Sequence, residues 1–207
     1  MGKAKRIFAI LMIGFAIVAV SSASADAANE WSVNGVKAFG TEAISNAIIN
    51  IPGGELEGDG IRVACPKMKI EEGEIKAGKT GTAKSAIFSE CVETVEETNC
   101  ELSSSMILTF RVKAEVVGVK EVEFAPEGTT EFTTIKINNR PGKTCVVKGV
   151  YKVTGTARAS LTNVNVEEFE HAMTFNGFSA LKINNNASTI VGSGNLKLTS
   201  GDAWSIQ

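Results

Sequence analysis

The sequence predicts an all-β protein: one antiparallel β-sandwich or barrel-like domain of about ten short strands, stabilised by two disulfides. Three observations predict this class. Apolar and polar residues alternate with a period of two, and turns rich in glycine and asparagine recur between the alternating stretches. The chain also begins with a segment typical of exported proteins, and four cysteines come after it. Export brings a chain into the oxidising setting in which disulfides form.

The first part of the chain has the pattern of a secretory signal peptide. A basic region at residues 3–6 precedes an apolar run at 7–20 and two overlapping A-x-A cleavage sites at 23–27. A membrane-spanning helix needs about 20 apolar residues, so a leader is favoured over an anchor. We expect residues 1–25 to be removed. Residues 26–207 then form one domain, secreted or on the cell-envelope exterior, or in the periplasm where the envelope has two membranes.

The composition limits the partners. The whole chain has a net charge of −2, and removing the leader, with its three cations and no acid, takes the charge to −5. This acidic balance disfavours nucleic acid, which is bound through basic surfaces. No second long apolar run follows, so we expect no membrane span once the leader is removed.

The clearest alternation predicts a strand from residue 106 to residue 116. Charged or polar residues occupy most odd positions, with Ile107 as the exception. One face of the strand is therefore expected to be buried, and it would carry Met106, Leu108, Phe110, Val112, Ala114 and Val116.

Further alternation predicts three more extended stretches. The run from Cys145 to Leu161 is long for one strand, and Gly149 and Gly155 are natural places for it to bend. The second stretch has a predicted inward-facing row of Phe169, His171, Met173 and Phe175. The third has a predicted inward-facing row of Ile190, Leu196 and Leu198.

Two segments near the chain ends carry separate predictions. Residues 41–51 fit a short helix and a strand equally well. The tripeptide Trp31-Ser32-Val33 is echoed by Trp204-Ser205-Ile206 near the C-terminus. We expect these terminal strands to be neighbours, each burying one indole in the same layer of the core.

The stretch CVETVEETNC, residues 91–100, is expected to be structural. Zinc sites need clustered ligands, and redox catalysis favours C-x-x-C. Neither spacing is present in this stretch, so we expect neither zinc binding nor redox catalysis here. The preferred pairing joins Cys91 to Cys100 and Cys65 to Cys145; the close alternative joins Cys65 to Cys91 and Cys100 to Cys145. Calcium loops usually combine Asp or Asn with a bending glycine. This segment has neither Asp nor Gly, so we interpret it as a solvated acidic loop. Its glutamates, with the two that flank it, are Glu90, Glu93, Glu96, Glu97 and Glu101.

No catalytic, cofactor-binding or metal-binding residue is predicted. His171 is the sole histidine, and its position places it on the apolar side of a strand. No nucleophile-elbow or phosphate-loop motif occurs. Glu167, Glu168 and Glu170 beside His171 form the best candidate for hydrolytic chemistry, although the polar face of a strand explains them equally well.

A resemblance adds one expectation. After Trp31, the segments VAC (63–65), FSEC (88–91), Cys100, CVVKG (145–149) and LTSGDAW (198–204) follow in order. In this order the chain resembles secreted four-cysteine β proteins of soil actinobacteria. The resemblance implies an exported β domain, and it implies no activity and no functional residue.

Three functions are compatible with the sequence. The first is an exported non-enzymatic β domain, with a structural or partner-binding role at the cell surface or outside the cell, and a protein or cell-surface partner. The second is a protein that binds a small apolar ligand, with space left by Ala114, Gly155, Ala157 and Ala159. The third is a hydrolase of cell-wall or polysaccharide material that uses glutamates. A closed apolar cavity would favour the second.

Overall fold

The protein is all-β, as predicted. The computed structural model describes residues 29–38, 40–44, 48–50, 54–95, 98–177 and 179–207. Within these residues there are 22 strands and no helix. Both described parts of the ambiguous segment 41–51 are strands, Thr41–Ile44 and Ile48–Asn50.

The strands of the first half of the chain are short. They are β1 (Trp31–Val33), β2 (Val36–Lys37), β3 (Thr41–Ile44), β4 (Ile48–Asn50), β5 (Glu55–Gly58), β6 (Ile61–Ala64), β7 (Lys67–Glu71), β8 (Gly73–Lys76), β9 (Thr80–Ala83), β10 (Ser85–Ser89) and β11 (Val92–Glu93). The second half has β12 (Cys100–Leu102), β13 (Met106–Leu108), β14 (Val112–Gly118), β15 (Glu121–Pro126), β16 (Glu131–Asn139), β17 (Gly149–Thr154), β18 (Ala157–Leu161), β19 (Glu170–Asn176), β20 (Lys182–Ile183), β21 (Asn186–Lys197) and β22 (Trp204–Ile206).

Several of these strands are the two halves of one bent strand. β7 and β8 are separated only by Glu72, whose φ is +47°, and β9 and β10 are separated only by Lys84. β8 pairs with β9 while β7 pairs with β10, so this hairpin passes from one sheet into another at its bend. Such corners let one strand contribute to two sheets, which explains why the strands outnumber the predicted ten.

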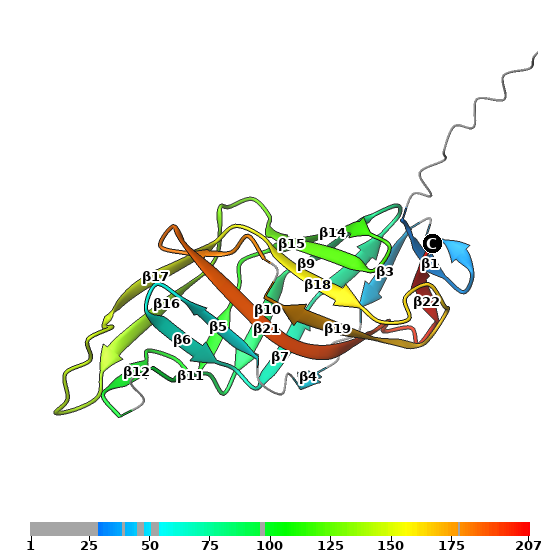
Figure 1. Cartoon of the computed structure of the whole chain (residues 1–207). Helices are drawn as coiled ribbons and strands as arrows, with labels where there is room; N and C mark the ends of the chain where they lie inside the picture. The colour runs from blue at the N-terminus through cyan, green and yellow to red at the C-terminus, as the bar shows by residue number, and fades with distance from the viewer. Residues whose placement is uncertain (1–28, 39, 45–47, 51–53, 96–97, 178) are drawn as a thin grey trace, which may run out of the picture.

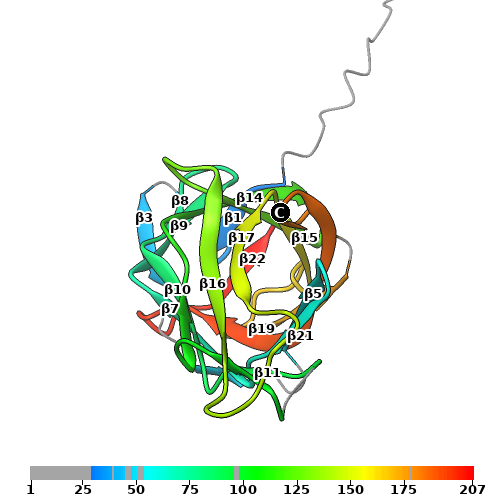
Figure 2. The same cartoon turned by 90° about the vertical axis from the view of Figure 1, so that its left-hand side faces the viewer.

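The sheets together form a barrel-like wall. The largest follows the order β12-β16-β17-β20-β21-β19-β18-β15-β14-β9-β8-β3, and the second is β13-β10-β7-β4. β5 pairs with both β21 and β6, and β6 pairs with β11. The molecule is elongated in side view (Figure 1), and in end view the strands surround a common interior (Figure 2). Inward-facing side chains of all these strands therefore share one core.

The terminal strands close one end of this wall, as predicted from the tryptophan echo. β1 and β22 are antiparallel, with Val33 opposite Trp204 and Trp31 opposite Ile206. Both indoles are buried, and their ring centroids lie 5.8 Å apart. The same end is visible at the C-terminal label in Figure 1.

Tight turns set the register of three hairpins. Asn34-Gly35, Asp59-Gly60 and Asn184-Asn185 each form a two-residue loop between paired strands, and all six residues have positive φ. This conformation matches the twist of the flanking strands and favours glycine and asparagine. The predicted bend at Gly155 is also confirmed: it separates β17 from β18 at φ +91°, and a Cβ there would collide with the carbonyl of Ala180.

The predicted strand from 106 to 116 is broken into β13 and β14, and the predicted inward face is wrong for its first half. The chain leaves the ladder after Leu108, because the amide of Phe110 bonds instead to the carbonyl of Phe132, 2.6 Å away. Such an interruption reverses which face each side chain takes. Val112 and Val116 are buried as predicted, whereas Met106, Leu108 and Phe110 are about half exposed, at 48, 49 and 51%.

Phe169 is a second error of the same kind. His171, Met173 and Phe175 are buried as predicted, but Phe169 is 68% exposed. β19 begins one residue later, and the preceding Glu168 is held in a bridge to Trp204. The alternation therefore does not extend to Phe169.

The preferred disulfide pairing is also wrong, and the alternative is observed. Cys65 joins Cys91, and Cys100 joins Cys145. β6 and β11 place Ala64 opposite Val92, so Cys65 and Cys91 are the next pair along, with Cα atoms 4.1 Å apart. Cys100 lies opposite Asn139, whose side chain accepts a hydrogen bond from the amide of Cys145.

Candidate ligand cavity

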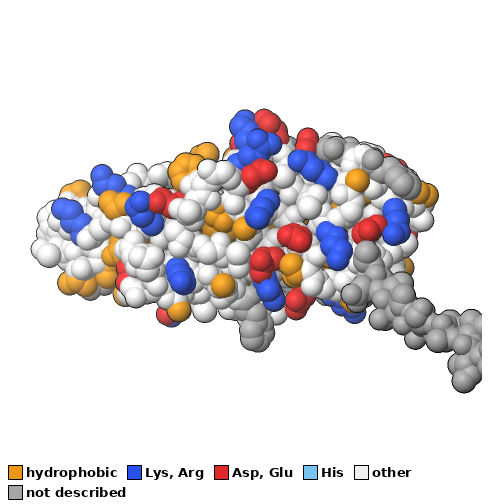
Figure 3. Space-filling model, turned by 90° about the horizontal axis from the view of Figure 1, so that it is seen from above, with side chains coloured by type: hydrophobic (Ala, Val, Ile, Leu, Met, Phe, Trp, Pro, Cys, Tyr) orange, Lys and Arg blue, Asp and Glu red, His pale blue; other side chains and the backbone are white. Residues whose placement is uncertain are grey.

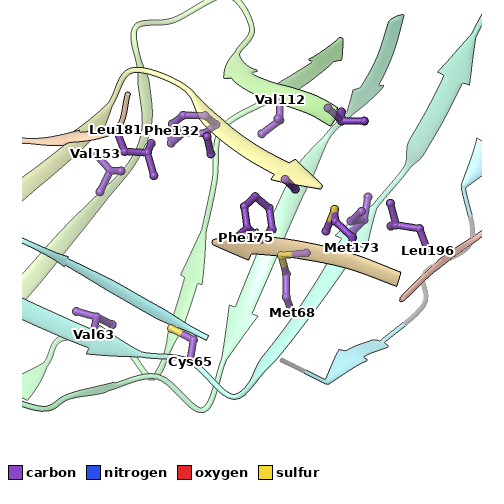
Figure 4. Packing of buried hydrophobic residues seen from close by; sticks show 14 of the residues in the cluster. Val63, Cys65, Met68, Val112, Phe132, Val153, Met173, Phe175, Leu181 and Leu196 are labelled. Carbon is purple, nitrogen blue, oxygen red and sulfur yellow. The ribbon is translucent and has the colours of Figure 1, made fainter. Parts of the chain in front are cut away.

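The interior of the barrel-like wall holds an apolar cavity of about 130 Å³. Figure 4 shows Val153 and Leu181 toward one end of the surrounding cluster, Met173 toward the other, and Phe175 between them. Its walls come from both sheets, and their larger apolar residues are Val63, Met68, Ile70, Phe88, Ile107, Val112, Phe124, Phe132, Ile135, Val153, Met173, Phe175, Leu181 and Ile190. Apolar cavities of about this size stay dry and take benzene-sized molecules.

The polar side chains in the wall already have partners. Glu55 forms an ion pair with Arg62, with Oε1 and Nε 2.7 Å apart. The Thr109 hydroxyl accepts from the amide of Ala86 at 2.7 Å, and the Thr133 hydroxyl donates to the carbonyl of Leu108 at 2.7 Å. The cavity therefore selects for molecules that need no hydrogen bond.

The small residues predicted to leave space contribute unequally. Ala157 lines the cavity, whereas Ala159 is buried outside its lining. Gly155 packs closely against backbone, and Ala114 packs half-buried against the core. Met68 and Ile70 were not predicted as cavity residues, although the alternation in KMKIE (67–71) indicates that both face inward.

The candidate hydrolytic cluster is occupied by structural contacts. The ring of His171 is buried, with Nε2 2.6 Å from the carbonyl of Trp204 and Nδ1 3.1 Å from the carbonyl of Thr162. The ring also meets the indole of Trp204 edge to face, with centroids 4.3 Å apart. These contacts hold the histidine between backbone carbonyls and an aromatic ring.

The neighbouring glutamates take different positions. Glu167 accepts hydrogen bonds from the hydroxyls of Ser32 and Ser205, at 2.9 and 2.8 Å, and so ties β1 to β22. Glu170 points to the side chain of Asn195. Glu167 therefore joins the two chain ends, and Glu170 is engaged separately, on β21.

The acidic loop is less solvated than predicted. Glu93 is buried, and its carboxylate accepts a hydrogen bond from the amide of Val95 at 2.8 Å. Glu90 is exposed and pairs with Lys67, and Glu101 is exposed. Glu96 and Glu97 lie outside the described residues. Among the residues that are described, no group of three His, Cys, Asp or Glu is arranged to hold a metal.

One phenol inside the wall has a shifted pKa. Tyr151 is buried beside the cavity-lining Val153, and its hydroxyl donates to the carbonyl of Val147 at 2.7 Å. Burial raises the pKa of Tyr151, and the negative charges of Asp59 and Glu93 raise it further. The phenol therefore remains neutral and serves as a hydrogen-bond donor.

The surface carries mixed charge. The face seen in Figure 3 shows lysine and arginine interspersed with aspartate and glutamate. Ion pairs also join neighbouring strands of the protein, such as Arg158 with Glu123 and Lys152 with Glu131. In the described part of the chain, none of the elements is a helix long and apolar enough to span a bilayer.

Comparisons of this chain with protein-family models, with curated proteins and with solved structures found no match.

Proposed function

We propose that this protein is an exported, non-enzymatic carrier or receptor that holds a small apolar molecule inside its β-wall. The observation that carries the proposal is the apolar cavity of about 130 Å³. Of the three functions compatible with the sequence, only ligand binding uses this feature. The hydrolase has less support, because His171 and Glu167 are engaged by the chain ends.

Export is supported by two features. The first 25 residues have the pattern of a leader. The two disulfides are typical of oxidising compartments, in which such bonds persist. A carrier outside the cytoplasm would meet apolar molecules that are poorly soluble in water.

The cavity defines the class of ligand. Its size favours a hydrocarbon-like molecule of about six to ten carbon atoms, such as a substituted benzene or a short branched chain. A charged or strongly polar group would lose its hydration without gaining a partner, because Thr109 and Thr133 are already hydrogen-bonded.

The natural methionines provide a direct test. Met68 and Met173 line the cavity, whereas Met106 is half exposed on the outside. In leader-free protein labelled with ¹³C at the methionine methyl groups, titration with toluene should shift the Met68 and Met173 signals to saturation and shift the Met106 signal much less. Equal shifts of all three, or none, would contradict the proposal.

A filled cavity provides the matched control. Ala157→Leu places extra carbon atoms in the cavity and should weaken toluene binding at least tenfold. Ala187 is exposed near the start of β21, so Ala187→Leu should bind like the parent. Thermal melts of both variants would show that the difference is not caused by unfolding.

A second candidate function is a surface domain that binds a protein partner. It is favoured by the exposed row Met106, Leu108 and Phe110, since exposed apolar rows often mark contact surfaces. The test is binding to the surface fraction of the exporting cell. Leu108→Lys should abolish it, while Val117→Lys, at an exposed valine of β14, should not.

A further inference from the structure

In the wall of the cavity, β13 and β16 lie close together without a ladder of hydrogen bonds between them, and we call this boundary the seam. The edge of β13 that faces away from β16 pairs in register with β10, with Leu108 opposite Ile87. β16 is likewise paired with β17 and, at its C-terminal end, with β12. β13 and β16 share no ladder in the described sheets, although they lie close together.

Isolated hydrogen bonds hold the seam instead of a ladder. At one end the amide of Phe110 donates to the carbonyl of Phe132, and the hydroxyl of Thr133 donates to the carbonyl of Leu108. At the other end the β12–β16 ladder is extended by one bond, from the amide of Ser103 to the carbonyl of Lys136 at 2.8 Å. Opening this seam costs fewer hydrogen bonds than separating the long laddered neighbours, such as β16 and β17 or β14 and β15.

A surface groove of about 150 Å³ lies on the seam. Its rim includes Met106, Leu108 and Lys136, and its floor includes Ile107, Thr133 and Ile135. The three floor residues also line the interior cavity. The groove and the cavity therefore share one partition, which is a single layer thick.

The outer surface of the groove offers nonpolar contacts to an apolar ligand. The interruption after Leu108 turns Ile107 toward the cavity and leaves Met106 and Leu108 about half exposed, at 48 and 49%. An apolar molecule can thus contact nonpolar surface on both sides of the partition, which lowers the cost of crossing it.

We infer that the seam between β13 and β16 is the route by which the apolar ligand reaches the cavity, and that the Thr133 hydroxyl is its latch. The inference rests on the proposed function. Removing the latch speeds passage in both directions and leaves the ligand's final contacts almost unchanged. Binding and release rates therefore change together, while the dissociation constant stays nearly constant.

The test measures exchange of toluene through the Met68 and Met173 methyl signals. Thr133→Val removes the latch and keeps the shape of the side chain, and should raise both rates about three- to tenfold, with the dissociation constant within about twofold. Thr133→Ser keeps the hydroxyl and should restore the parent rates. The amide of Phe110 should also exchange its hydrogen faster in Thr133→Val alone.

A matched control uses a hydroxyl of the same kind in a laddered wall. The hydroxyl of Thr162 donates to the carbonyl of Ala172 between β18 and β19. Thr162→Val should leave the rates unchanged. Thr134→Trp, on the outer rim of the groove, should slow both rates.

The outcomes separate the two proposals. If toluene binds the parent and neither Thr133→Val nor Thr134→Trp changes the rates, the seam is not the route, and the carrier function stands. If toluene does not shift Met68 or Met173 in the parent, the carrier function fails and the route fails with it.

Discussion

Around the paired chain ends, aromatic and polar side chains pack against one another and form hydrogen bonds. Trp31 and Trp204 pack together, His171 lies between two backbone carbonyls, and Glu167 joins the serines of β1 and β22. The middle of the molecule is different: its wall is built from aliphatic, methionine and phenylalanine side chains that leave a cavity.

This difference separates two uses of a β interior. At the chain ends, directional contacts fix one arrangement and add stability. Around the cavity, apolar side chains with few directional contacts leave room for a ligand. A cavity costs stability, since its lining loses packing partners. Substitutions in the two regions should therefore lower the free energy of unfolding by different amounts.

The largest effect is expected at the packed end. Trp204→Ala should lower the free energy of unfolding by about 4 kcal/mol, because the indole fills the space between Trp31 and His171. Phe175→Ala, in the cavity wall, should cost about 3 kcal/mol, because the cavity already deprives the ring of neighbours. Urea unfolding followed by circular dichroism would measure both.

A conservative variant at the same position serves as the control. The indole nitrogen of Trp204 is buried and has no hydrogen-bond partner in the described part of the chain. Trp204→Phe should therefore lose only about 1–2 kcal/mol, from its smaller ring. An equal loss in Trp204→Ala and Phe175→Ala would contradict the contrast between the two regions.

The next effect concerns the covalent link near the far end of β16. The Cys100–Cys145 bridge closes a loop with a sequence separation of 45 residues. Replacing both cysteines with alanine should cost about 3 kcal/mol, since the unfolded chain gains freedom. Denaturation with and without the bridge would measure the loss. Peptide mapping that recovered Cys91 linked to Cys100 would contradict the observed pairing.

The sequence determines the class of fold more clearly than its connections. Alternation predicted inward-facing His171, Met173 and Phe175 correctly, because local period directly reports which face is buried. The tryptophan echo predicted the pairing of β1 with β22. Both signals lie within short stretches of the chain.

Apart from the pairing of β1 with β22, features that depend on distant partners were not predicted correctly. The disulfide pairing follows from the register of β6 against β11, which no local pattern contains. The exposure of Met106 and Leu108 follows from the move of the chain toward β16 at Phe110. The cavity is harder still, because it depends on how far apart opposite walls stand rather than on any residue type.

A smaller effect should come from filling the cavity. Ala157→Leu should raise the free energy of unfolding by about 1 kcal/mol, because it buries more apolar surface without displacing close neighbours. Thermal melting would show the gain, and added toluene should then raise the melting temperature less than it does in the parent. A destabilised Ala157→Leu protein would mean that the space is smaller than about 130 Å³.

The smallest effect belongs to the bend of the hairpin formed by β7, β8, β9 and β10. The Ser85 hydroxyl donates to Glu71 at 2.9 Å, and this bond, followed by the charge of Lys84, lowers the pKa of Glu71 below 4.5. A lowered folded-state pKa contributes stability above pH 4.5, and that contribution is lost as the pH falls through the folded-state pKa.

The effect should be slight because the Glu71 carboxyl remains accessible to water. Carboxyl ¹³C titration should show the pKa of Glu71 moving up toward 4.5 in Ser85→Ala, because the largest cause of the shift is removed. Lys84→Met should move it less, since that charge is the second cause. A larger shift in Lys84→Met than in Ser85→Ala would mean that charge, and not the hydroxyl bond at the bend, determines the titration of this carboxyl.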